Sequence, residues 1–211
     1  MTNMYKSVLA ALEKCPLVPV LTIEDAGQGA DLAKALVGAG LTVAEVTLRT
    51  ADALKVIENM KRAAPELIVG AGTILSIDDL NNAVEAGSDF VVTPATDKYL
   101  REALIKISIP VFPGCATPSE ALTLYRHGFE YLKFFPAESN GGVKALKSMA
   151  APMPDIKFMP TGGINERSVK DYLDCPNVIA VGGSWMIDQK ALKNSNWNLV
   201  ENLAQKSVSQ I

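Results

Sequence analysis

The sequence contains few of the residues that build zinc sites and serine-protease-like triads. Among 211 residues there is one histidine, His127, and there are three cysteines, Cys15, Cys115 and Cys175. This scarcity disfavours His-based zinc sites and Ser-His-Asp triads. The cysteines are odd in number, far apart and without metal-like spacing, so we interpret them as small buried hydrophobic residues of a reduced, cytosolic protein. His127 precedes Gly128 and is expected to end a helix.

The chain also lacks an excess of basic charge and any long apolar run. Lys and Arg number 20 against 23 Asp and Glu, for a net charge of −3. No basic face is available to neutralise phosphates, which argues against a nucleic-acid partner. No stretch approaches the ~20 apolar residues of a membrane helix, and residues 1–12 do not resemble a signal peptide. We therefore expect a cytoplasmic protein without a membrane partner.

What is present is a repeated pattern of an amphipathic helical stretch, a glycine or proline, and a short apolar strand. Near-continuous apolar strands are typical of a parallel sheet that is covered on both faces. The predicted strands are residues 18–21, 41–48, 67–69, 90–93, 110–112, 131–135, 156–159 and 178–181.

Eight strands alternating with helices predict an α/β fold, a (β/α)8 TIM barrel that forms a single domain over residues 1–211. A helix over residues 4–13 is expected to cover the bottom of the barrel. The alternative is an open doubly wound sheet. That alternative is less favoured because residues 20–25, Val-Leu-Thr-Ile-Glu-Asp, contain no G-x-G-x-x-G turn after the first strand.

A lysine interrupts the aromatic strand Tyr-Leu-Lys-Phe-Phe at residues 131–135. Alternation places Lys133 and Phe135 on one face of this strand. A lysine removed from water favours its neutral amine, which Schiff-base chemistry requires. On this stretch alone, a lysine whose ammonium reaches solvent remains the alternative.

The second predicted strand carries polar residues at alternate positions, Glu45, Thr47 and Arg49. These side chains are expected to point inward at the carboxyl end of the barrel, where active sites of this fold lie. A structural ion pair between Glu45 and Arg49 is the alternative. Four residues of strand span ~13 Å, which strains a direct contact.

Glycines and hydroxyl residues follow several other predicted strands. Thr73 follows Gly70 and Gly72, which bring backbone close to a ligand or serve a tight turn. Pro94 ends the fourth strand. After the seventh and eighth strands stand Thr161-Gly162-Gly163 and Gly182-Gly183-Ser184, each expected to open a helix. Bare backbone N–H groups at these two strands predict a phosphate or similar anion site.

These motifs resemble one family. Together they look like 2-keto-3-deoxy-6-phosphogluconate (KDPG) aldolase, also called 4-hydroxy-2-oxoglutarate (KHG) aldolase. The resemblance is carried by the stretches 45–50, 69–73, 133–138, 160–164 and 182–185, in order along the chain.

The resemblance implies a metal-free class I aldolase of the Entner–Doudoroff pathway, without cofactor, that forms a homotrimer. Such a lyase cleaves KDPG to pyruvate and glyceraldehyde 3-phosphate, and 4-hydroxy-2-oxoglutarate to pyruvate and glyoxylate. The implied roles are as follows: Lys133 forms the Schiff base, Glu45 is the general acid/base, Arg49 and Thr73 hold the substrate carboxylate, Pro94, Phe135 and Thr161 wall the pocket, and Gly162, Gly163 and Ser184 bind phosphate. Ala95 departs from the family pattern, where glycine is expected, and this leaves the role of Pro94 less secure.

Two other classes of function remain open on the residues alone. A phosphate-binding barrel could be an isomerase or epimerase, with Glu45 as base and Lys133 acting only electrostatically. It could also bind a phosphosugar without turnover, although burying two charges for binding alone is costly. A metal-dependent aldolase is disfavoured by the single histidine. The preference between the two aldolase substrates is not encoded in these motifs.

Overall fold

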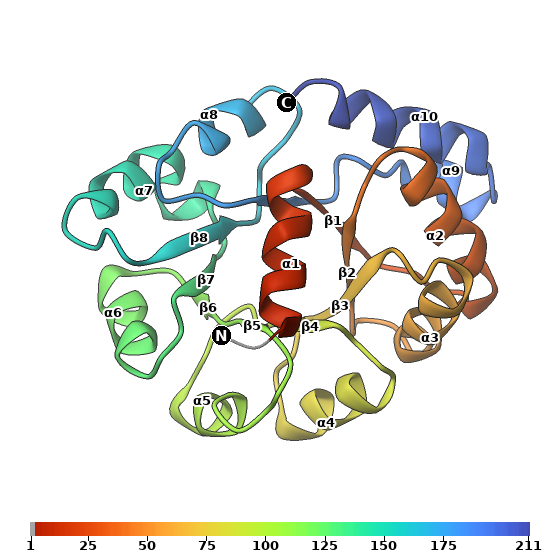
Figure 1. Cartoon of the computed structure of the whole chain (residues 1–211). Helices are drawn as coiled ribbons and strands as arrows, with labels where there is room; N and C mark the ends of the chain where they lie inside the picture. The colour runs from red at the N-terminus through yellow and green to blue at the C-terminus, as the bar shows by residue number, and fades with distance from the viewer. Residues whose placement is uncertain (1–2) are drawn as a thin grey trace.

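In the computed structural model, which describes residues 3–211, strands and helices alternate along the chain (Figure 1). The strands are β1 Leu17–Leu21, β2 Val43–Thr47, β3 Ile68–Gly72, β4 Phe90–Val92, β5 Val111–Phe112, β6 Gly114–Cys115, β7 Tyr131–Phe134, β8 Lys157–Pro160 and β9 Val181–Gly183. The α-helices are α1 Asn3–Lys14, α2 Gly29–Gly38, α3 Ala53–Ala63, α4 Ile77–Glu85, α5 Lys98–Leu104, α6 Pro118–Arg126, α7 Gly142–Ala150, α8 Val169–Leu173, α9 Gln189–Lys193 and α10 Trp197–Val208, and the short 3-10 helices are η1 Ala26–Gln28 and η2 Glu138–Asn140.

The strands form two parallel sheets. A curled six-stranded sheet has the order β5-β4-β3-β2-β1-β9, and a three-stranded sheet has the order β6-β7-β8. The chain passes from one sheet to the other at Pro113, the single residue between β5 and β6. On the opposite side the sheets are linked by two isolated bridges, Phe158 with Val178 and Thr161 with Gly182. The expected alternation of parallel strands and helices is thus confirmed, but the hydrogen-bond ladder is not one continuous eight-stranded ring.

The predicted strands occur near their expected positions, with two corrections. Gly182 and Gly183, expected to follow the eighth strand, belong to β9, where they pair with Val18 and Pro19 of β1. The glycine pairs also do not open helices directly, since α8 begins at Val169 and α9 at Gln189. These glycines are in a strand because they pair with β1, which is distant in sequence. Local β-propensity cannot predict such a pairing.

Alternation along the strands divides the core into two clusters. Helices surround the strands in Figure 1. Outward-facing strand residues such as Val46 belong to the same core cluster as the buried residues of these helices, Leu36 of α2 and Ile57 of α3 among them. The inner cluster contains Val18, Val43, Phe90 and other strand residues. Two residues of α1, Val8 and Leu12, complete this inner cluster. The helix α1 therefore lies over the amino ends of the strands, as expected, and crosses the middle of the view in Figure 1.

The three cysteines, Cys15, Cys115 and Cys175, are free and buried. Burial raises the pKa of the Cys115 thiol to about 12, which removes its nucleophilic thiolate at neutral pH. None of the helices among residues 3–211 combines the length and apolarity that crossing a bilayer requires.

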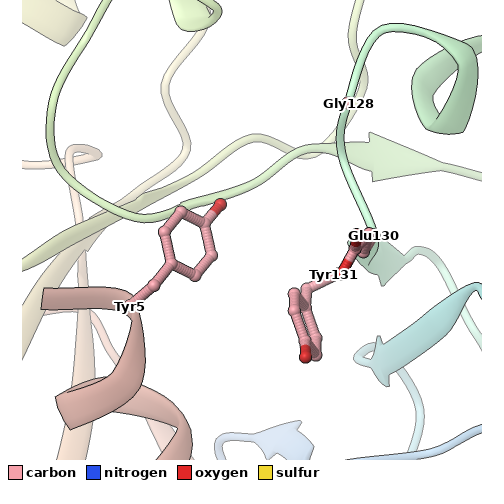
Figure 2. Close-up of a pocket in the computed structure, with 4 residues that line it drawn as sticks. All are labelled: Tyr5, Gly128, Glu130 and Tyr131. Atoms are coloured by element: carbon pink, nitrogen blue, oxygen red, sulfur yellow. The ribbon is translucent and has the colours of Figure 1, made fainter. Parts of the chain in front are cut away.

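A small cavity lies where α1 meets the start of β7. It has a volume of about 150 Å³ and is lined by Tyr5, Gly128, Glu130 and Tyr131. Figure 2 shows Tyr5 on α1 and Tyr131 on the segment that enters β7, and their ring centroids are 6.2 Å apart. The Tyr5 hydroxyl donates to Val111 O at 2.8 Å and accepts from Val111 N at 2.9 Å. The residues around this cavity therefore attach α1 to the amino ends of the strands. Lys133 lies toward the carboxyl ends.

We expect Tyr5→Phe to lower the free energy of unfolding by about 1–3 kcal/mol, because it leaves the Val111 peptide groups without the phenol partner. Urea unfolding measures the loss. Tyr99→Phe is the control, since Tyr99 is 75% exposed on α5. Equal stabilities of the two variants would contradict the role of the phenol.

Candidate active site

The carboxyl ends of the strands surround a cavity of about 350 Å³. Its lining comes from β1, β7 and β9, from the loops after β1, β2, β7, β8 and β9, and from α9. The lining residues are Val20, Thr22, Arg49, Lys133, Phe135, Thr161, Gly162, Gly163, Ile164, Gly183, Ser184 and Gln189. Most residues with predicted functional roles therefore gather at one cavity, at the end of the fold where such sites are built.

Lys133 and Glu45 form a buried ion pair at the base of this cavity. Lys133 Nζ lies 3.2 Å from Glu45 Oε1, and their side chains are 5% and 0% exposed. The ammonium also lies 5.3 Å from the centroid of the Phe135 ring. Glu45 Oε2 is buried and has no hydrogen-bond partner among residues 3–211. A buried carboxylate with one free oxygen beside a buried amine is costly for stability, which is typical of a site that exchanges protons.

The position of Glu45 depends on Gly72 of the neighbouring strand. A Cβ at Gly72 would lie 1.9 Å from Glu45 Oε1, closer than any real contact. Thr47, two residues further along β2 and on the same face, is fully buried, and its hydroxyl donates to Leu21 O at 2.9 Å. The glycine thus provides the space that lets the carboxylate turn toward Lys133.

Arg49 and Thr73 lie together at the rim. Arg49 Nε donates to Thr73 Oγ1 at 3.2 Å. Thr73 has φ +62°, a left-handed conformation that costs a β-branched residue free energy and is found at functional sites. Arg49 is exposed and lines the cavity, so its guanidinium remains available for a carboxylate.

The loop after β8 presents backbone groups to the other side of the cavity. Gly162 and Gly163 have φ of +103° and +82°. Thr161 Oγ1 is buried and has no hydrogen-bond partner within the described chain. Ser184 is exposed at the end of β9. Loops of this kind, with bare N–H groups and hydroxyls, suit an anion.

Three of the predicted residues lie outside the lining. Glu45 lies behind Lys133 and Thr73 behind Arg49, each joined to the cavity through its partner. Pro94 is half-buried, and its carbonyl packs against Gly114, where a Cβ would lie 2.5 Å away. The structure therefore does not bring Pro94 to the cavity. Over residues 3–211 no three His, Cys, Asp or Glu side chains are grouped to hold a metal ion.

Comparison with known proteins decides the family. The family model described as KDPG and KHG aldolase matches residues 8–203. The chain belongs to this aldolase family. It is therefore an aldolase, that is, a lyase.

Individual relatives agree with this membership. The 2-dehydro-3-deoxy-phosphogluconate aldolase of Pseudomonas aeruginosa is 43% identical over 92% of this chain and 88% of its own length. The KHG/KDPG aldolase of Escherichia coli is 39% identical over 99% of this chain and 98% of its own. A crystal structure of KDPG aldolase from Legionella pneumophila, with pyruvate captured at low pH as a covalent carbinolamine intermediate, has a TM-score of 0.91. It is 38% identical and covers 95% of this chain and 97% of that one.

Sequence reasoning missed several residues at the aldolase cavity. Val20 and Thr22 stand at the carboxyl end of β1, and Gln189 begins α9. Thr22 Oγ1 lies 2.9 Å from Thr47 Oγ1, so this hydrogen bond joins the carboxyl end of β1 to that of β2. The signal for Thr22 was available, because every strand of a parallel fold contributes its carboxyl end to the site. Gln189 gives no such signal, since its place depends on the length of the loop after β9.

For Gly72→Ala we expect kcat for aldol cleavage to fall by about 10²-fold, because the new methyl group displaces the Glu45 carboxylate. Steady-state pyruvate release measures it. Gly70→Ala is the matched control on the same strand, since the atoms nearest its Cβ belong to the Phe90 ring, at 2.3 Å, and not to the Glu45 carboxylate. That variant loses stability with a much smaller change in kcat. Similar kcat values in both variants would show that the carboxylate position does not matter.

Proposed function

We propose that this chain is a class I aldolase that cleaves KDPG to pyruvate and glyceraldehyde 3-phosphate, and KHG to pyruvate and glyoxylate. The observation that carries the proposal is the buried pair of Lys133 Nζ and Glu45 Oε1, 3.2 Å apart. The covalent pyruvate carbinolamine of the Legionella pneumophila relative supports the same chemistry for this chain. The names of the Pseudomonas aeruginosa and Escherichia coli relatives support the two substrates.

The reaction begins with proton transfer from the Lys133 ammonium to Glu45. The neutral amine attacks the C2 ketone and gives a carbinolamine, and Glu45 returns its proton as the C2 hydroxyl leaves as water. The resulting iminium accepts the electrons of the C3–C4 bond while Glu45 takes the proton of the C4 hydroxyl, which releases the aldehyde. Glu45 then protonates C3 of the enamine, and water hydrolyses the iminium to free pyruvate and Lys133.

The other cavity residues orient the substrate. Arg49 binds the carboxylate beside C2 through its planar fork, and Thr73 fixes the guanidinium by the bond at 3.2 Å. Phe135 and Thr161 wall the pocket around the pyruvyl half. Gly162, Gly163 and Ser184 take the phosphate at the far end. Pro94 acts only indirectly, through its contact with Gly114.

The proposal extends to the assembly of the protein. We propose that the two sheets together act as one (β/α)8 barrel, and the isolated bridges of Phe158 with Val178 and of Thr161 with Gly182 support this. The chain is one domain, works without metal or other cofactor, and assembles as a cytoplasmic homotrimer. Sedimentation velocity tests the trimer, and a monomer at micromolar concentration would contradict it.

Borohydride reduction in the presence of pyruvate tests the central step. The reagent reduces the iminium to a stable secondary amine, and peptide mass spectrometry locates the adduct. We expect the pyruvyl adduct on Lys133. An adduct on another lysine, or none, would remove Lys133 from the Schiff-base role and leave an isomerase or a binding protein as the better interpretation.

A further inference from the structure

The Gly162–Gly163 loop, which follows β8, is fixed to the strand that carries Lys133. Ala137 N donates to Thr161 O at 2.8 Å, and Glu138 N donates to Gly162 O at 3.1 Å. These two bonds attach the residues just beyond β7 to the loop. Residues 137–138 therefore help to set the distance between the lysine and the bare N–H groups of the loop, together with the bond from Thr161 N to Phe134 O at 3.0 Å.

The side chain of Glu138 is in turn held by Tyr172 of α8. The Tyr172 hydroxyl donates to Glu138 Oε1 at 2.6 Å. Tyr172 is fully buried, whereas Glu138 lies at the surface. Burial, followed by the bond to Glu138 and its charge, raises the pKa of Tyr172, so the phenol remains a donor at neutral pH. A charge-assisted bond to a buried donor is stronger than an ordinary surface contact.

Two glycines give this pair its space. A Cβ at Gly163 would lie 2.7 Å from Glu138 Cβ and Cγ, and a Cβ at Gly142 would lie 2.9 Å from the Tyr172 hydroxyl oxygen. The Glu138 stem thus packs on the loop, while its carboxylate is held at the tyrosine. A carboxylate that turned toward the loop would repel a bound phosphate.

We propose that Glu138 and Tyr172 are positioning residues that set the Gly162–Gly163 loop for phosphate and thereby determine the preference for phosphorylated substrates. This inference rests on the proposed aldolase function and on the phosphate site at that loop. Neither residue touches the reacting atoms. Their effect is expected in the phosphate half of the substrate and not in Schiff-base formation.

The test compares two quantities: the KM for KDPG, which carries a phosphate, and the trapping of pyruvate on Lys133, which does not involve one. We expect Tyr172→Phe to raise KM for KDPG about tenfold, because the loop loses its support and the carboxylate is released. The pyruvate concentration that gives half-maximal borohydride trapping on Lys133 stays within about twofold, because pyruvate carries no phosphate. Glu138→Ala also raises KM for KDPG, because the loop loses the side chain that packs on it, but by less than Tyr172→Phe, since no released carboxylate remains to repel the phosphate. Glu138→Gln keeps an acceptor for the phenol and stays within about threefold of the parent KM.

The matched control is Tyr125→Phe, in which another phenol, 3.4 Å from Asp155 Oδ2 on an exposed face, is removed. It is expected to change neither readout. If Tyr172→Phe fails to fold, Glu138→Ala decides the question from the surface end of the pair. A parallel loss of both readouts, or an unchanged KM for KDPG, overturns the inference. Absence of trapping in the unaltered protein would instead overturn the proposed function.

Discussion

Replacement of Lys133 by methionine is expected to lower kcat for KDPG cleavage by at least about 10⁴-fold, the scale seen when a covalent nucleophile is removed. Within residues 3–211, Lys133 is the one lysine that lines the cavity. Without the amine no iminium forms, and the electrons of the C3–C4 bond have no acceptor. Pyruvate release and borohydride trapping both measure the loss.

Lys61→Met is the matched control for activity. Lys61 Nζ lies 2.6 Å from Asp89 Oδ1, and the two side chains are 28% and 27% exposed. Asp89 also accepts from Val69 N at the amino-terminal side of β3 and β4, away from the cavity. This variant is expected to retain activity. A Lys133→Met enzyme with more than about 1% of the parent kcat would contradict covalent catalysis at this residue.

Lys133→Met also tests the energetics of the buried pair. It leaves the Glu45 carboxylate at 0% exposure without its cation. We expect a loss of about 3–5 kcal/mol in the free energy of unfolding at neutral pH, the usual cost of an uncompensated buried charge. The double variant Lys133→Met, Glu45→Gln is expected to recover most of it. Urea unfolding of the parent, the single variant and the double variant measures these differences, and so shows how much free energy of unfolding depends on the pairing of the two charges.

Strand alternation was sufficient to predict the inner faces of β2 and β7. Glu45, Thr47 and Lys133 point inward because successive side chains of a strand point to opposite sides. The same rule could not predict that Glu45 Oε1 and Lys133 Nζ meet at 3.2 Å. That contact depends on the register Glu45 with Gly70 and on the open space at Gly72, which are relations between strands.

The parts of the fold that the sequence did not reveal are those decided by distant partners. The residues Gly114 and Cys115 were not expected in a strand, yet they pair with Lys133 and Phe134 as β6. A two-residue strand leaves no periodic pattern to detect. The hydrogen bond between Tyr172 and Glu138 joins residues 34 positions apart, and only the packing of α8 against residues 138–142 produces it.

Glu45→Gln is expected to separate Schiff-base formation from proton transfer. The amide cannot accept the proton of the C4 hydroxyl or protonate C3, so kcat for cleavage falls by about 10²–10⁴-fold. The iminium still forms, more slowly, because Lys133 keeps its amine and water can carry the protons that Glu45 otherwise transfers during carbinolamine formation and dehydration. Borohydride therefore still traps pyruvate on Lys133. The exchange of the pyruvate methyl protons for deuterium in D₂O, which NMR measures, reports proton transfer at C3. We expect this exchange to be lost together with cleavage.

Asp89→Asn provides the control, since it removes the carboxylate from the partly buried pair with Lys61, away from the cavity. It costs stability but leaves methyl exchange intact. Normal exchange in Glu45→Gln would assign the proton transfers to water or to another group. Loss of trapping together with exchange would mean that Glu45 is already required for iminium formation, and would leave its proton transfers at C3 and at the C4 hydroxyl without support. Loss of exchange with trapping retained is the result expected of a Glu45 that transfers protons at C3, since both steps use Lys133 but water does not replace the carboxylate at carbon.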